Sequence, residues 1–136
     1  MTSTPARPTV RGQRQLTSIA GEHLVAGELS KRGWIATLTG KNTPGFDVLA
    51  ARPTGYTVCI DVKTRSTAYQ YAWRLGSGIH ISGKRDFTVL VDLGEDDEPP
   101  LYWIIPARTA QKLTTDNQIR DKDVEEFQNR WELLDP

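Results

Sequence analysis

The chain has 136 residues, and its 17 lysines and arginines balance 17 acidic residues, so its formal net charge is zero. This length is typical of a single domain with one sizeable core. No apolar run reaches the roughly 20 residues of a membrane span, the amino terminus lacks the apolar segment of a signal peptide, and a single cysteine excludes an internal disulfide. We therefore expect a cytoplasmic protein that does not bind membranes.

The charges are distributed unevenly along the chain. Residues 1–85 hold 12 basic and four acidic residues, a net charge of +8, whereas residues 86–136 hold five basic and 13 acidic residues, a net charge of −8. If this segregation survives folding, the basic half provides a face suited to a polyanion. Acids retained where phosphate would be attracted are expected to hold a cation. Three of the four acids in the basic half are Glu22, Asp47 and Asp61.

The amino-terminal part predicts an arm followed by a helix. Residues 1–13 are rich in Thr, Ser, Pro and Gly and contain arginines but no acid, which is typical of a flexible basic arm. We expect one domain over 14–136. Apolar residues recur at helical spacing from about Arg14 to Arg32, and Gly33 is a helix stop signal. Glu22 flanks the apolar stripe of this helix, and a solvated surface acid is its simpler interpretation.

Three strands are predicted next, over 34–39, 46–51 and 56–63, each rich in β-branched, aromatic or other apolar residues and bounded by turn residues. A short Pro- and Gly-containing turn joins the last two, which favours an antiparallel hairpin. Such a hairpin would bring Asp47 close to Asp61.

The second half predicts two more strands and two helices, so the fold class is α/β, with a central mixed β-sheet of about five strands flanked by helices. The elements expected in order are an extended loop or short strand within 64–77, a central strand over 87–93, a strand over 101–105, a helix from Pro106 to about Leu113, and a closing helix over 121–134 with Val124, Phe127, Trp131 and Leu134 on one face.

The candidate site centres on Asp61-Val62-Lys63, because alternation along a strand places Asp61 and Lys63 on one face. Buried charges of this kind are costly unless they are paired or bind a metal. Mg²⁺ prefers oxygen ligands and takes only one or two carboxylates, which Asp47 and Asp61 fit, together with the backbone carbonyl of Val62. A lysine beside them would orient the attacking water or neutralise phosphate charge. Cys59, in the same strand, is expected to be inert core.

Three segments resemble the PD-(D/E)xK nuclease superfamily, the restriction-endonuclease-like fold, and are similar to its small Holliday-junction-resolvase-like members. They are Gly21-Glu22 through Trp34, then Gly45-Phe46-Asp47-Val48, and Ile60-Asp61-Val62-Lys63-Thr64-Arg65. The resemblance covers roughly residues 14–106. It implies that Asp47 and Asp61 are metal ligands, that Lys63 is catalytic, and that Glu22 assists the metal site, by holding either a metal-bound water or a second ion. It also implies Mg²⁺, with Mn²⁺ as a substitute, and no organic cofactor. In a departure from the pattern, Phe46 rather than proline precedes Asp47, and an aspartate at 61 is one methylene shorter than a glutamate.

Basic and aromatic residues after this strand are candidates for contacting nucleic acid, through phosphate neutralisation and base stacking. They are Arg65, Tyr69, Tyr71, Trp73, Arg74, Lys84 and Arg85. By contrast, Trp34, Trp103 and Trp131 are expected in the core.

These observations predict a metal-dependent endonuclease acting on duplex or branched DNA as a homodimer, with contact through Phe127 and Trp131 or through the acidic half. The sequence leaves open whether the substrate is DNA or RNA. It also leaves two alternatives: a catalytically silent module of the same fold that binds nucleic acid or a protein partner, and an α/β interaction domain whose acids are merely solvated.

Overall fold

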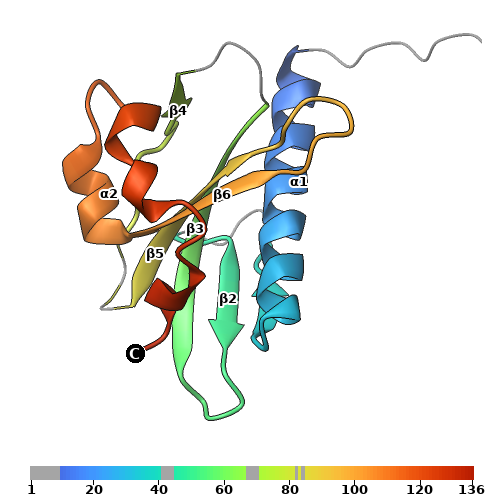
Figure 1. Ribbon diagram of the computed structural model, residues 1–136, viewed down its shortest axis with the longest axis vertical. Coiled ribbons are helices and arrows are strands. Elements are labelled where there is room, and N and C mark those ends of the chain that lie inside the picture. Colours follow the sequence, from blue (N-terminus) through green and yellow to red (C-terminus); the bar gives the residue numbers. More distant parts are fainter. Residues whose placement is uncertain (1–9, 41–44, 67–70, 82, 84) are drawn as a thin grey trace, which may run out of the picture.

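The computed structural model describes residues 10–40, 45–66, 71–81, 83 and 85–136 (Figure 1). The elements are α1 (Val10–Lys31), β1 (Ile35–Leu38), β2 (Val48–Ala51), β3 (Thr57–Arg65), β4 (Ala72–Arg74), β5 (Asp86–Asp92), β6 (Leu101–Pro106), α2 (Ala107–Leu113), β7 (Gln118–Arg120) and the short 3₁₀ segments η1 (Asp121–Asp123), η2 (Glu125–Phe127) and η3 (Trp131–Leu134).

A five-stranded sheet with the order β1-β2-β3-β5-β6 forms the centre of the fold, which confirms the predicted α/β class. Its pairs are antiparallel except for the parallel pair β3 and β5. Parallel neighbours need a long crossover, and the segment between them supplies it, with β4 pairing antiparallel to β7 in a separate two-stranded ribbon. The predicted hairpin of β2 and β3 is confirmed.

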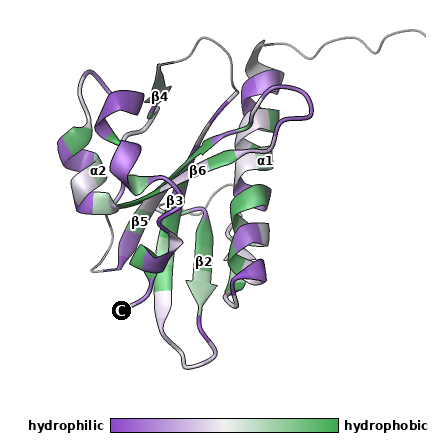
Figure 2. Ribbon diagram, viewed as in Figure 1, coloured by the Kyte–Doolittle hydropathy of each residue, from purple (hydrophilic) through white to green (hydrophobic). Residues whose placement is uncertain are grey.

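The sheet separates two apolar cores. On one face, Val25 and Leu29 of α1 pack with Ile60 of β3. On the other face, α2 and the β4–β7 ribbon cover β5 and β6, with Trp73 and Trp103 in T-shaped contact. Figure 2 shows the sheet strands coloured mostly hydrophobic between these layers. The central strands are therefore buried on both sides, which fixes the side chains at the ends of β3.

Helix α1 approaches β3 very closely at Gly21. A β-carbon there would lie 1.7 Å from Oγ1 of Thr64, so only glycine fits this position. The contact fixes both the height and the rotation of α1 against the strand, and thereby the position of the next residue, Glu22.

One helix start and one whole element differ from the prediction made from the sequence. Helix α1 begins at Val10 rather than near Arg14, and residues 1–9 of the expected arm lie outside the described residues. The predicted closing helix is wrong: η1, η2 and η3 replace it, because the chain turns at Asn129 with a φ of 57° and Gln128 bridges to Trp103.

The apolar residues predicted for one face of that helix serve different cores. Val124 and Phe127 pack in the core with Trp73, whereas Trp131 and Leu134 join the core with α1. Trp131 is only 5% exposed, so the expected dimer contact through this side chain is also wrong. The prediction that Trp131, Trp34 and Trp103 are core residues is confirmed. None of the helices in the described part of the chain is long and apolar enough to cross a membrane.

Candidate active site

The two predicted carboxylates meet where β2 begins beside β3. The backbone N–H of Asp47 donates to the carbonyl of Ile60 at 2.8 Å, and its side-chain Oδ2 accepts from the N–H of Val62 at 2.7 Å. Asp47 thus extends the hydrogen bonding between β2 and β3: its backbone N–H bonds Ile60, and its carboxylate takes the place of a backbone acceptor for the N–H of Val62. This geometry holds its carboxyl group within hydrogen-bond reach of Asp61.

Asp61 is buried and does not titrate like an ordinary aspartate. The pKa of Asp61 is raised from 3.8 to about 7. Burial is the largest cause, and the hydrogen bond and charge of Asp47 act in the same direction, whereas the charge of Lys63 and a hydrogen bond from the backbone of His80 lower the pKa. Asp61 therefore binds a proton more readily than an ordinary aspartate, and a bound cation would favour its charged form instead.

Lys63 is held beside this pair by a backbone carbonyl. Its Nζ donates to the carbonyl oxygen of Leu75 at 2.9 Å and lies 3.7 Å from Oδ2 of Asp61. Because Leu75 directly follows β4, the ribbon determines where the ammonium group points.

An open cleft of about 1270 Å³ brings the predicted catalytic residues together. Glu22, Asp47 and Asp61 are the acids among its described lining residues, and Lys63 lies between them and the ribbon. Strand β2 pairs with β3 only as far as Ile60, so the edge of β3 beyond that residue faces the cleft. The carbonyl of Val62 lies on this edge, because it points to the same side of the strand as the N–H of Val62, which donates a hydrogen bond to the side chain of Asp47.

This donor set fits a hard divalent cation better than a soft one. Within the ranges that the structure describes, no three His, Cys, Asp or Glu side chains converge as a complete metal site. Mg²⁺ commonly takes only one or two carboxylates and completes its shell with waters and substrate phosphate. Asp47, Asp61 and the carbonyl of Val62 satisfy that requirement.

Two residues predicted to contact nucleic acid are buried instead. Trp73 is 1% exposed, and its Nε1–H donates to the carbonyl of Val91 at 2.9 Å, so the prediction that it stacks on bases is wrong. Arg65 is 8% exposed, forms ion pairs with Asp92 and Asp121, and lies 3.7 Å from the Trp73 ring centroid. Its guanidinium is a structural group rather than an exposed phosphate ligand.

The other nucleic-acid candidates have different positions. Tyr71 and Arg74 are exposed and line the cleft. Arg85 is exposed but packs over the ring of Tyr56 at 4.4 Å, and it is not among the residues that line the cleft. Tyr69 and Lys84 lie outside the described residues.

Four residues on the amino-terminal half of α1 line the cleft but were not predicted from the sequence. Their spacing from Gly21, one and two helical turns back on the same face, was the available signal. They are Gln13, Arg14, Thr17 and Ser18.

Comparison with known proteins supports the fold. Neither a protein-family model nor a curated protein matches the chain. Among solved structures, a bacterial homing endonuclease, I-Ssp6803I, superposes with a TM-score of 0.59 at 15% sequence identity, over 88% of this chain and 89% of that chain. The chain therefore has a nuclease-like α/β fold, and the predicted central mixed β-sheet of about five strands flanked by helices is confirmed.

Proposed function

We propose that this protein is a divalent-metal-dependent endonuclease of the PD-(D/E)xK type that hydrolyses phosphodiester bonds in DNA. The observation that carries the proposal is the meeting of the half-buried Asp47 with the buried Asp61 beside Lys63, in a cleft whose remaining described acid is Glu22. The fold shared with an endonuclease supports it.

Each residue has a distinct role in this proposal. Asp47, Asp61 and the carbonyl of Val62 hold Mg²⁺, or Mn²⁺ in its place. When bound, the ion supplies charge neutralisation at the phosphate and lowers the pKa of water. Lys63, fixed by the carbonyl of Leu75, orients the attacking water and stabilises charge on the phosphate in the transition state. Glu22 assists the metal ligands from α1.

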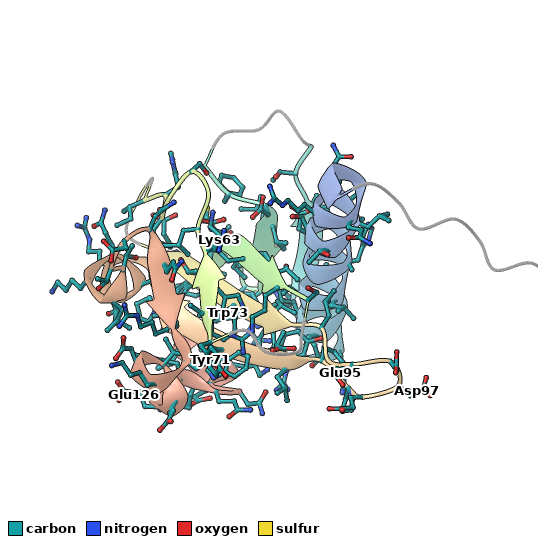
Figure 3. The ribbon with its side chains drawn as sticks, turned by 90° about the horizontal axis from the view of Figure 1, so that it is seen from above. Lys63, Tyr71, Trp73, Glu95, Asp97 and Glu126 are labelled. Atoms are coloured by element: carbon teal, nitrogen blue, oxygen red, sulfur yellow. The ribbon has the colours of Figure 1, made fainter. Side chains whose placement is uncertain are left out.

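Cleavage of supercoiled plasmid with Mg²⁺, Mn²⁺ or a chelator tests this assignment. The wild-type protein should nick the plasmid only with a metal ion, and Asp61→Asn and Lys63→Ala should each reduce the rate by at least about 100-fold, as the loss of one transition-state contact does. Glu95→Gln is the matched control, because Glu95 is exposed on the β5–β6 turn (Figure 3) and does not line the cleft. An Asp61→Asn protein that cuts at the wild-type rate would refute the assignment.

A catalytically silent module of the same fold is the second candidate. The incomplete set of metal-ligating side chains among the described residues favours it. It predicts binding of nucleic acid or a protein partner that Asp61→Asn leaves unchanged, and no cleavage under any metal condition.

The endonuclease assignment also leads us to propose a homodimer, because two copies place two sites against the two strands of a duplex. Light scattering at micromolar concentration tests this state, and a monomer mass with undiminished double-strand cleavage would contradict it.

A further inference from the structure

One face of α1 forms a polar wall that leads from the rim of the cleft to the candidate active site. Gln13, Arg14, Thr17 and Ser18 line the cleft and precede Gly21 by eight, seven, four and three residues, so they share one face of the helix with Gly21, next to Glu22. The contact of Gly21 with Thr64 fixes the rotation of the helix, so this face is turned toward β3 along its length. At 1.5 Å per residue, the wall extends about 14 Å from Glu22 to Gln13.

The β4–β7 ribbon forms the opposite wall. Tyr71 and Arg74 are exposed there and line the same cleft, and Figure 1 shows the carboxyl end of β3 between α1 and β4. Tyr71 is 79% exposed, the largest value among the exposed large apolar side chains of the described chain. Figure 3 shows it beyond Trp73, in line with Lys63. An aromatic ring this exposed buries little apolar surface in the fold and is accessible to a ligand in the cleft.

The charges along the cleft suit a nucleic-acid backbone. The first turn of α1 contains no acid, and Arg14 and Arg74 stand on opposite walls. All described acids of the cleft lie at the candidate active site. Phosphates would thus be attracted along the walls, while the carboxylates are confined to the point where a cation neutralises them.

We propose that this cleft binds an unpaired DNA strand, with its backbone along the Gln13–Ser18 face of α1 and a base stacked on Tyr71. The inference rests on the proposed nuclease function and names its substrate: DNA with an unpaired segment at the cleavage site, such as a single strand, flap or branch. A stacking ring needs a base face, and within an intact duplex both faces of each base are covered by neighbouring bases. The polar side chains of α1 are of the kind that contact phosphates without reading sequence.

Fluorescence anisotropy in a chelating buffer, where cleavage does not occur, tests the inference with three labelled probes. They are a short single strand, a blunt duplex of the same sequence, and that duplex with an unpaired flap. The single strand and the flap should bind more tightly than the blunt duplex. Tyr71→Ala should weaken binding of the single strand by about five- to 150-fold, the range for loss of one base stack, whereas Tyr71→Phe should retain it.

The arginines are tested through the salt dependence of binding to the single strand. Arg14→Gln and Arg74→Gln should each reduce the slope of log K against log salt by about 0.7, as expected for one lost phosphate contact. Arg108→Gln, at an exposed position of α2 that does not line the cleft, is the control and should leave the slope unchanged.

Two results would overturn the inference: an unchanged affinity of Tyr71→Ala for the single strand, or tighter binding of the blunt duplex by the wild-type protein. The proposed function fails separately. A protein that binds the flap as described but does not cut it with Mg²⁺ is not a nuclease, and a protein that cuts but prefers the blunt duplex is a nuclease with a different substrate.

Discussion

Strand β3 carries two clusters of buried charge, and their difference separates the candidate active site from the scaffold. Each nitrogen of the Arg65 guanidinium donates to a carboxylate: Asp92 accepts from Nε, and Asp121 accepts from both terminal nitrogens. The guanidinium also lies over the ring of Trp73. Four residues earlier, the carboxyl group of Asp61 faces that of Asp47, and the ammonium group of Lys63 lies 3.7 Å from it, beyond hydrogen-bond distance.

The two clusters differ in how completely their charges are paired. Around Arg65 every charged group has an opposite charge in hydrogen-bond contact, as a structural site requires. Around Asp61 two acids meet, and burial together with Asp47 raises the pKa of Asp61, which is the condition that a cation relieves. Substitutions in each cluster should therefore have different consequences, of which the largest is expected at Arg65.

Removing the central cation of the complete cluster should have the largest effect on stability. Arg65→Ala leaves Asp92 buried without its charge partner, and we expect the free energy of unfolding to fall by about 3–5 kcal/mol. Urea denaturation measures this loss. Arg108→Ala, at an exposed position, should change the value by no more than about 0.5 kcal/mol, and an equally small effect of Arg65→Ala would remove the distinction between the clusters.

The incomplete cluster should make stability depend on pH. Folded Asp61, with a pKa of about 7 against an ordinary 3.8, keeps a proton that the unfolded chain releases. The stabilisation that protonated Asp61 gives to the folded state is therefore complete below about pH 4 and is lost as the pH rises through about 7. The free energy of unfolding should fall over this range by on the order of 4 kcal/mol at most. Asp61→Asn should abolish this dependence and be more stable than the wild type at about pH 8.

Addition of Mg²⁺ provides the control for that prediction. At about pH 8 it should raise the Tm of the wild-type protein by binding the folded state, and it should have no such effect on Asp61→Asn. A wild-type Tm that does not respond to Mg²⁺ or Mn²⁺ would mean that a cation does not complete this cluster.

A matched pair of glycines tests whether the close packing of α1 on β3 positions Glu22 in the cleft beside the incomplete cluster. Gly21→Ala forces a β-carbon against Thr64 and should lower stability by about 1–3 kcal/mol, together with the cleavage rate. A β-carbon at Gly27, in the same helix, would have no neighbouring atom within 4 Å, so Gly27→Ala should stabilise the protein by about 0.5–1 kcal/mol without loss of activity. Thermal unfolding of both variants beside plasmid cleavage measures the contrast, and equal effects would contradict the close approach of α1.

The smallest effect is expected at the outer carboxylate of the complete cluster. Asp121 has a side chain that is 45% exposed, so water screens and replaces its interaction, and Asp121→Asn should cost no more than about 1 kcal/mol. Urea denaturation at low and high salt checks this value. A loss as large as that of Arg65→Ala would show that the pair with Asp121 dominates the cluster.

Local patterns were sufficient to predict the elements whose determinants lie close together in sequence. The turn between β2 and β3 contains Pro53 and Gly55, and the flanking apolar residues are continuous, so the hairpin and the meeting of Asp47 with Asp61 followed. The prediction of a closing helix was wrong because the spacing of Val124, Phe127 and Trp131 is compatible both with one continuous helix and with a series of separate turns. The left-handed conformation of Asn129 divides these residues between two cores.

The errors at the site have a different origin. Arg65 and Trp73 were predicted to contact nucleic acid because basic and aromatic residues follow the candidate site in the sequence, but Arg65 pairs with Asp121, which lies 56 residues further along the chain, and packs over Trp73. No local pattern contains that partner. Strand β7, which aligns Asp121 with this pair, was too short to be recognised from three residues.

The sequence distances within the two clusters also determine when each can assemble. Asp47 and Val62 are 15 residues apart and are joined through a hairpin, whereas Arg65 and Asp121 are separated by 56 residues. Closing a longer loop costs more chain entropy before any contact compensates it, and pairings of distant segments form later in folding. We therefore expect the carboxylates to come together early in folding and the β4–β7 ribbon, which directs Lys63 toward them, to be secured later, so that the cleft is complete only at the end of folding.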